Sequence, residues 1–259
     1  MSKRIDRTGE RGINNFGSQM IIVEYRSNRD IDVYFEEYGY IAKYKEYKDF
    51  RKGNVKCPYE RRYFGVGYLG EGRYKISENG KHTKVYSTWY RMIGRCYDKK
   101  YQEKHHTYIG CEVNEEFHNF QNFGGWDSEN YYQIDDEKMC LDKDILIKGN
   151  KIYSPNTCIY VPERINTLFV KSDKTRGNLP IGTTRRKNGK YVAQCNIINP
   201  ETGKSKGKNL GYYTTQQEAF NVYKQFKEKN IKEVADYYKE QIPTKLYDAL
   251  YNYQVEITD

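Results

Sequence analysis

The sequence lacks the features that mark membrane proteins and secreted proteins. No apolar run reaches the length of about 18 residues that a membrane-spanning helix needs. The first residues, MSKRIDRTGERG, are polar and charged, and the apolar segment of a signal peptide does not follow them. We therefore expect a soluble, intracellular protein that has no membrane partner.

Closely spaced metal ligands are also missing. The 6 cysteines are scattered without a CxxC pair, and there are only 4 histidines. This distribution excludes the usual structural zinc cage and a disulfide framework, so we expect reduced thiols. His105 and His106 stand near Cys111 and leave two alternatives open: a zinc site completed by distant cysteines, or a pair of histidines on the surface.

Basic residues, by contrast, are in excess and unevenly placed. The formal net charge is +9 and the isoelectric point is near 9.0. The stretch 174–210 holds nine lysines or arginines and a single acidic residue, Glu201. Codon bias toward Lys, Asn, Ile and Tyr is one explanation of the basic composition. The concentration in one segment favours the other, a polyanionic partner.

The hydrophobic pattern predicts an α+β protein of three parts. Short alternating strands are expected within residues 20–41, and a glycine-rich hairpin within 62–76. The spacing of Trp89, Met92 and Cys96 predicts a helix, and a second helix is expected from Val113 to a stop at the glycines 124–125. The stretch 138–170 predicts strand, loop, strand and helix. Three further strands and a long helix capped by threonine are predicted for 179–240.

Three stretches of the central part together resemble phage-encoded proteins of the HNH (ββα-metal) endonuclease superfamily. They are WYRMIGRCYDKKY, EEFHNFQNFGGW and LDKDILIKGNKIYSPNTCIYVPERIN, and the resemblance runs from about residue 65 to 169. It implies a catalytic site with Asp142 as the metal ligand at a strand end and Lys143 at the position of the family's histidine base. Asn156 would be the middle asparagine and Asn166 the ligand from the helix.

Lysine at the base position changes the expected chemistry. The neighbouring carboxylates Asp142 and Asp144 favour the charged form of Lys143, so this side chain is better suited to hold a phosphate than to take a proton. If the strand continues, Asp142 and Asp144 share one face and could bind one Mg²⁺ or Mn²⁺ together with Asn166. The base would then be water on the cation or one of the histidines 105, 106 and 118. The alternative is a solvated strand end on an inactive scaffold.

The last part is similar to the plant APETALA/ERF-type DNA-binding domain over about residues 180–223. The resemblance rests on residues that include Gly182, Leu210, Gly211 and Ala219. It implies a three-stranded sheet that lies in the major groove and is backed by a helix. The implied DNA contacts are Arg185, Arg186, Lys187, Lys190 and Tyr191. Tyr191 replaces a tryptophan common in the family, so the base specificity of the family does not carry over.

Together these observations predict a small N-terminal β module (1–62), a central HNH-like nuclease domain (63–172) and a C-terminal ERF-type domain with a helical tail (173–259). The expected function is that of a homing-endonuclease-like phage enzyme, which nicks or cleaves double-stranded DNA with a divalent metal in the cytoplasm of a bacterial host. The alternative is a catalytically inactive DNA-binding or inhibitory phage protein that keeps the fold. The sequence does not indicate a partner for the N-terminal module.

Overall fold

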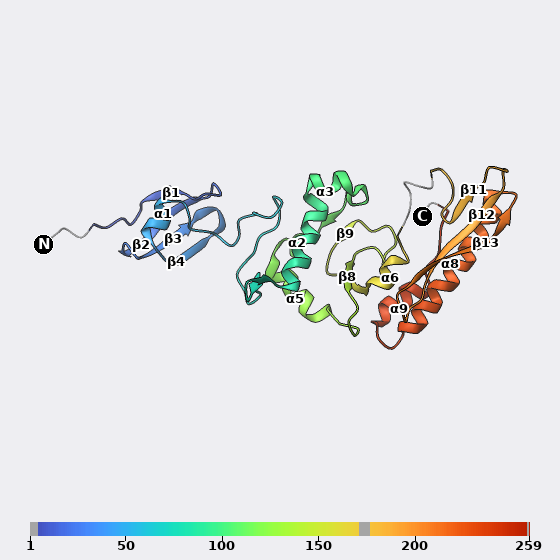
Figure 1. The fold of residues 1–259 in the computed structure, drawn as a ribbon. Coiled ribbons are helices and arrows are strands. Elements are labelled where there is room, and N and C mark those ends of the chain that lie inside the picture. The colour runs from blue at the N-terminus through green and yellow to red at the C-terminus, as the bar shows by residue number, and fades with distance from the viewer. Residues whose placement is uncertain (1–4, 171–176, 258) are drawn as a thin grey trace. The chain divides into compact units, whose positions relative to one another are not determined.

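The computed structural model of the 259-residue chain describes residues 5–170, 177–257 and 259. Helices and small sheets alternate along it, so the chain is an α+β protein, as its sequence predicts (Figure 1). It divides into two compact units, one of residues 1–129 with 152–155 and one of residues 130–151 with 156–259. The predicted central range 63–172 contributes to both units. In the described residues, no helix combines the length and the apolar character that crossing a bilayer requires.

The N-terminal part is a four-stranded antiparallel sheet whose order follows the chain. Its strands are β1 (Arg11–Ile13), β2 (Gln19–Ser27), β3 (Asp30–Phe35) and β4 (Tyr40–Lys45), and the short helix α1 (Tyr47–Arg51) comes next. Alternate residues of the strands fill a core with α1, which confirms the predicted strands. Asn14 fixes the β1–β2 loop because its Oδ1 accepts the N–H groups of Phe16, Gly17 and Ser18.

The predicted glycine-rich hairpin at 62–76 is wrong. This stretch has one isolated bridge, between Tyr63 and Gly67, and a two-stranded hairpin forms only afterwards, from β5 (Ser77–Glu78) and β6 (Lys81–His82). The backbone of Tyr74 finds its partners in a side chain instead, since Gln121 Oε1 accepts its N–H and Gln121 Nε2 donates to its carbonyl. A distant glutamine thus replaces the strand partner.

The predicted helix around Trp89 is confirmed as α2 (Lys84–Tyr97), which buries Trp89, Met92 and Cys96. Trp89 Nε1 donates to the Phe117 carbonyl at 2.8 Å and so ties α2 to the next helical segment. Following α2 are two short helices, a parallel strand pair and two further helices. These elements are α3 (Lys99–Lys104), η2 (His106–Tyr108), β7 (Glu112–Val113) paired with β9 (Ile152–Tyr153), α4 (Glu115–His118) and α5 (Phe120–Asn130).

The predicted stop at the two glycines is also wrong, because Gly124 and Gly125 lie inside α5. At Gly124 a Cβ atom would lie 2.5 Å from the Tyr74 ring, so the glycine lets this ring approach the helix axis. The helix continues and brings Trp126 into the core, where its Nε1 donates to the Pro155 carbonyl. Local breaking propensity is outweighed here by aromatic packing.

The second unit begins with strands β8 (Met139–Asp142) and β10 (Ile159–Pro162), an antiparallel pair on which the helix α6 (Glu163–Thr167) packs. Strand β8 is shorter than predicted, since residues 143–147 form a bend. Apolar side chains of β10 and α6 share one core with the end of a long helix, α8 (Gln216–Tyr238), and with α9 (Thr244–Tyr251).

A three-stranded antiparallel sheet covers the first half of α8 (Figure 1). Its strands are β11 (Thr183–Arg185), β12 (Tyr191–Ile198) and β13 (Ser205–Tyr213). Thr215 caps α8 in a capping box with Glu218, as the sequence predicts. Ile198 at the end of β12 joins the core formed by α6, α8 and α9. Arg164 of α6 adds to this connection by donating to the Pro200 carbonyl at the β12–β13 turn.

Candidate functional site

The strand end at Asp142 is a tight turn closed by its own side chain. Asp142 Oδ1 accepts the backbone N–H of Asp144 at 2.9 Å and that of Ile145 at 2.7 Å. These two bonds compete with the ladder and stop β8 at Asp142. The expectation that Asp142 and Asp144 share the face of a continuing strand is therefore wrong. The turn, and not the strand pleat, brings the two carboxylates near each other.

Burial raises the pKa of Asp142 to about 6, and the nearby Asp144 carboxylate adds to this rise. The bonds from the backbone and the charge of Lys143 act in the opposite direction. Lys143 itself is only 8% exposed, and its Nζ lies 3.4 Å from Asp144 Oδ2. The ammonium group thus points to the carboxylates of its own turn.

The other predicted members of this site lie near the same strands. Asn156 occupies the exposed turn before β10, and Asn166 lies partly buried on α6, which packs on β8. Both keep the predicted order of strand end, loop and helix. Within the described part of the chain, no hydrogen bond joins the side chain of Asn156 or Asn166 to Asp142 or Asp144.

The three histidines that could act as a base belong to the first unit. His105 stacks on Tyr101 with ring centroids 4.4 Å apart, and His106 begins a short 3-10 helix. His118 is 8% exposed and packs edge-on against Tyr97. Burial lowers the pKa of His118, which favours the neutral imidazole.

A divalent metal can be tested against these donors. Mg²⁺ is often held by one or two carboxylates and keeps several waters. Asp142 Oδ2 and the Asp144 carboxylate could be these two ligands. Among residues 5–170, 177–257 and 259, no three His, Cys, Asp or Glu side chains gather closely enough to hold an ion by themselves. Two carboxylates would leave such an ion mostly hydrated, and Lys143 would compete with it for Asp144.

The second candidate site is the face of the β11–β13 sheet that points away from α8. Register defines it, because residues paired across an antiparallel ladder point to the same side. Thr184 pairs with Val192, Val192 with Tyr212, and Gln194 with Asn209. We call this surface the outer face. Its members are Thr184, Val192, Gln194, Asn196, Gly207, Asn209 and Tyr212.

The basic residues of the sheet divide between its two sides. Arg186 and Lys190 continue the register of the outer face into the β11–β12 turn, where the Arg186 N–H donates to the Lys190 carbonyl. Lys187 lies in that turn and is exposed. Arg185 instead pairs with Tyr191 on the side of α8, with its guanidinium carbon 5.9 Å from the Tyr191 ring centroid. The register thus separates Arg186 and Lys190 from Arg185 and Tyr191.

Two glycines and a bulge shape this sheet. Leu210 is the extra residue of a bulge opposite Ala193 and Gln194, and it lets both Leu210 and Gly211 face α8. At Gly182, with φ +74°, a Cβ atom would lie 2.0 Å from the ring of Tyr223 on α8. Only glycine permits this approach, so the sheet packs closely on its helix.

The outer-face amides and Tyr212 are functional candidates that the sequence reading misses. Gln194, Asn196 and Asn209 are exposed, and Tyr212 is 58% exposed. The alternation in YVAQCN contains this signal, because the exposed Gln and Asn stand at every second position. The bulge in β13 determines which residues of that strand belong to the outer face.

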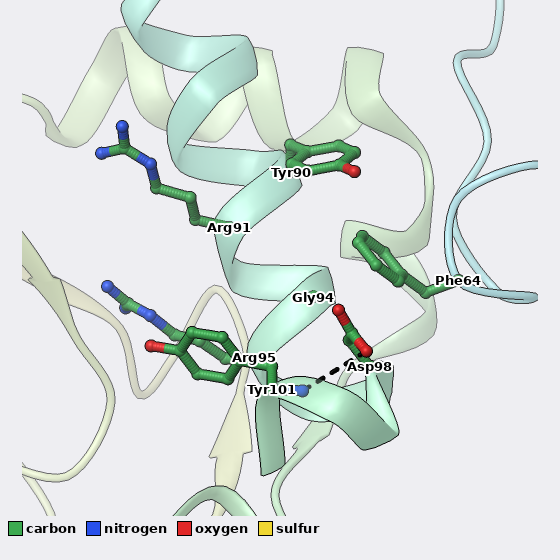
Figure 2. A pocket seen from close by; sticks show the side chains of 7 residues that line it. All are labelled: Phe64, Tyr90, Arg91, Gly94, Arg95, Asp98 and Tyr101. Carbon is green, nitrogen blue, oxygen red and sulfur yellow. Dashed lines mark hydrogen bonds between the residues drawn. The ribbon is translucent and has the colours of Figure 1, made fainter. Parts of the chain in front are cut away.

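A small pocket in the first unit lies along α2 and was not predicted either. Its volume is about 350 Å³, and Gly94 is one of the residues that line it. Figure 2 shows Phe64 and Tyr90 on one side of the helix and the arginines 91 and 95 on the other. Asp98 is engaged at the start of α3, where it accepts the backbone N–H of Tyr101 (Figure 2).

Comparison of the chain with protein-family profiles, curated proteins and solved structures gives no match.

Proposed function

We propose that the chain binds double-stranded DNA through the outer face of the β11–β13 sheet. The observation that carries this proposal is a sheet face on which Gln194, Asn196 and Asn209 are exposed and Val192 is buried, with Arg186 and Lys190 at its hairpin end. Between residues 177 and 213, Glu201 is the only acidic residue. Such a surface is complementary to a polyanion whose grooves carry donors and acceptors.

The dimensions support the same partner. Three strands spaced about 4.8 Å apart give a sheet about 10 Å wide between its outer strands, against a major groove about 12 Å wide. Because α8 covers the opposite face, the outer face is the one that can enter a groove. Basic side chains beside the entering strands can then contact the phosphates on both sides of the groove.

Fluorescence anisotropy with a labelled duplex at several salt concentrations tests this proposal. The double variant Arg186→Ala, Lys190→Ala should bind more weakly, and its salt slope should fall by about 0.9 for each phosphate that the variant no longer neutralises. A matched control is the double variant Lys229→Ala, Lys245→Ala, which removes two exposed lysines from α8 and α9. Equal reductions of affinity in the two double variants would overturn the outer face as the binding surface.

A second candidate function, metal-dependent nicking of the bound DNA, is favoured by one observation at the Asp142 turn. Burial and, after it, the nearby Asp144 carboxylate raise the pKa of Asp142 to about 6, and the Lys143 ammonium group lies 3.4 Å from Asp144 Oδ2. A divalent ion bound there would supply positive charge to a scissile phosphate. Asp142 Oδ2 and Asp144 would hold the ion, while Lys143 would add a fixed positive charge for the phosphate.

A supercoiled plasmid incubated with Mg²⁺ or Mn²⁺ tests the second candidate. Asp142→Ala should lose nicking by orders of magnitude while its DNA affinity stays unchanged. Lys143→Arg should keep most of the rate and Lys143→Ala should lose it, because arginine preserves the charge but does not act as a base. If the parent chain never nicks DNA with either ion, the turn has no catalytic role. The DNA-binding proposal then remains as that of a protein without nuclease activity.

A further inference from the structure

We infer that the outer face recognises adenine in the major groove, and that Gln194 makes the contact. This inference rests on the proposed DNA binding and names the base that is read. Gln194 lies near the middle of β12 and is exposed. Its Nε2 donates to Thr184 Oγ1 on the neighbouring strand at 3.0 Å.

That hydrogen bond orients the amide before DNA binds. A glutamine amide has two N–H donors and a carbonyl acceptor. With one N–H directed at Thr184, the second N–H and Oε1 remain to contact a ligand. Ordering a glutamine side chain costs conformational entropy, and the bond to Thr184 lowers the part of this cost that falls on binding. Thr184 is therefore a positioning residue, and Gln194 is the residue that contacts the base.

The remaining donor and acceptor match one base. In the major groove adenine presents the acceptor N7 beside the donor N6–H₂. Guanine presents two acceptors, O6 and N7. If N7 accepted from Nε2 of Gln194, Oε1 would face the second acceptor, O6, and the two oxygens would repel each other. Thymine offers an acceptor and a methyl group, and cytosine offers only a donor. Adenine alone accepts from Nε2 and donates to Oε1 along one edge.

The neighbouring amide does not duplicate this readout. Asn209 is the direct cross-strand partner of Gln194, and its Oδ1 accepts the N–H of Gly211 at 2.9 Å. Its Nδ2 donors are left, and they can bind any acceptor, such as thymine O4 or a purine N7. Base discrimination therefore depends on Gln194.

The first experiment selects tight binders from a pool of randomised duplexes with the full chain. The selected sites should contain a preferred adenine. Replacing it by guanine should weaken binding about 5- to 140-fold, the range for one bidentate contact. Gln194→Ala should lose this preference and still bind duplex DNA. Gln217→Ala, an exposed amide at the start of α8, should keep the preference.

The second experiment changes the base and leaves the protein fold alone. A duplex with 7-deazaadenine lacks the N7 acceptor, and a duplex with purine lacks the N6 amino group. Each should weaken binding by the parent chain and have little effect on Gln194→Ala, because the partner group is already absent. Thr184→Val keeps the side-chain shape and removes the hydroxyl, so it should reduce the preference for adenine without abolishing binding.

The outcomes separate the two claims. If the chain binds duplex DNA but Gln194→Ala keeps the parent's preference, or the analogues weaken both proteins equally, adenine recognition by Gln194 is overturned and DNA binding stands. If the selected sites contain no fixed adenine, the result is the same. If the chain binds no duplex at all, the proposed function fails first.

Discussion

Replacement of Gly182 by alanine should destabilise the second unit more than any other single methyl group added to the sheet turns. Gly182 has φ +74°, and an added Cβ would lie 2.0 Å from Cδ2 and 2.2 Å from Cγ of Tyr223. Tyr223 is 5% exposed and belongs to the core between the sheet and α8, so its ring has little room to move. The change therefore combines backbone strain with overpacking.

The magnitude follows from these two parts. A left-handed conformation costs an L-residue about 1–2 kcal/mol, and an extra methyl in a filled core costs about 1–3 kcal/mol. Gly182→Ala should then lower the free energy of unfolding by about 2–5 kcal/mol. Gly189 is the matched control, because its φ is +81° and nothing lies within 4 Å of an added Cβ. Gly189→Ala should lower the free energy of unfolding only by the contribution of backbone strain, about 1–2 kcal/mol.

Urea unfolding followed by far-UV circular dichroism measures the difference between the two variants. Tryptophan fluorescence gives a second reading, because both tryptophans, Trp89 and Trp126, lie in the first unit. The larger loss for Gly182→Ala should appear in the dichroism of the helices. Equal losses for the two alanine variants would refute the close contact between the β11 turn and Tyr223.

Three further predictions concern other parts of the second unit. The pKa of Asp142 rises from 3.8 to about 6 in the folded chain. Its favourable contribution to the free energy of unfolding is therefore full below pH 3.8 and is lost as pH rises through 6. Asp142→Asn keeps the acceptor for both N–H groups and should remove this pH dependence. The variant should gain at most about 3 kcal/mol in its free energy of unfolding at pH 8, measured by urea unfolding. An unchanged pH profile would contradict the raised pKa of Asp142 as the cause of the dependence. If the Asp142 turn binds Mg²⁺, adding Mg²⁺ should raise the urea midpoint of the parent and not that of Asp142→Asn. Thr215→Ala should remove the cap of α8 and cost about 0.5–2 kcal/mol by the same measurement, whereas no loss would show that the capping box contributes nothing.

Periodic packing and local capping could be predicted from the sequence. The spacing of Trp89, Met92 and Cys96 gives a buried helix face, and the threonines before residue 216 give a helix start. These predictions hold because each depends on residues that are neighbours in the same element. A helix face repeats every three to four residues, and a cap bonds backbone groups only a few residues away.

The residues at which strands and helices end could not be predicted in the same way. These ends depend on side chains that pack from elsewhere in the chain or on local hydrogen bonds from a side chain to the backbone. Strand β8 stops at Asp142 because its carboxylate takes two backbone N–H groups, although β-branched residues follow. Helix α5 runs through Gly124 because the ring of Tyr74 packs where a side chain would be. Propensity predicts the reverse in both places, since it does not include these competing contacts.

The side of the sheet on which each candidate residue lies was decided only by the tertiary structure. Arg185 and Arg186 are adjacent in the sequence, yet the register places Arg185 toward α8 and leaves Arg186 with the outer face. Gln194 and Asn209 share that face only because the bulge at Leu210 shifts the pairing by one residue. Side chains alternate along a strand, so a shift of one residue exchanges the two faces. The sequence by itself predicted three strands in a basic segment and a capped helix after them, and strand pairing determined which residues of the sheet face outward.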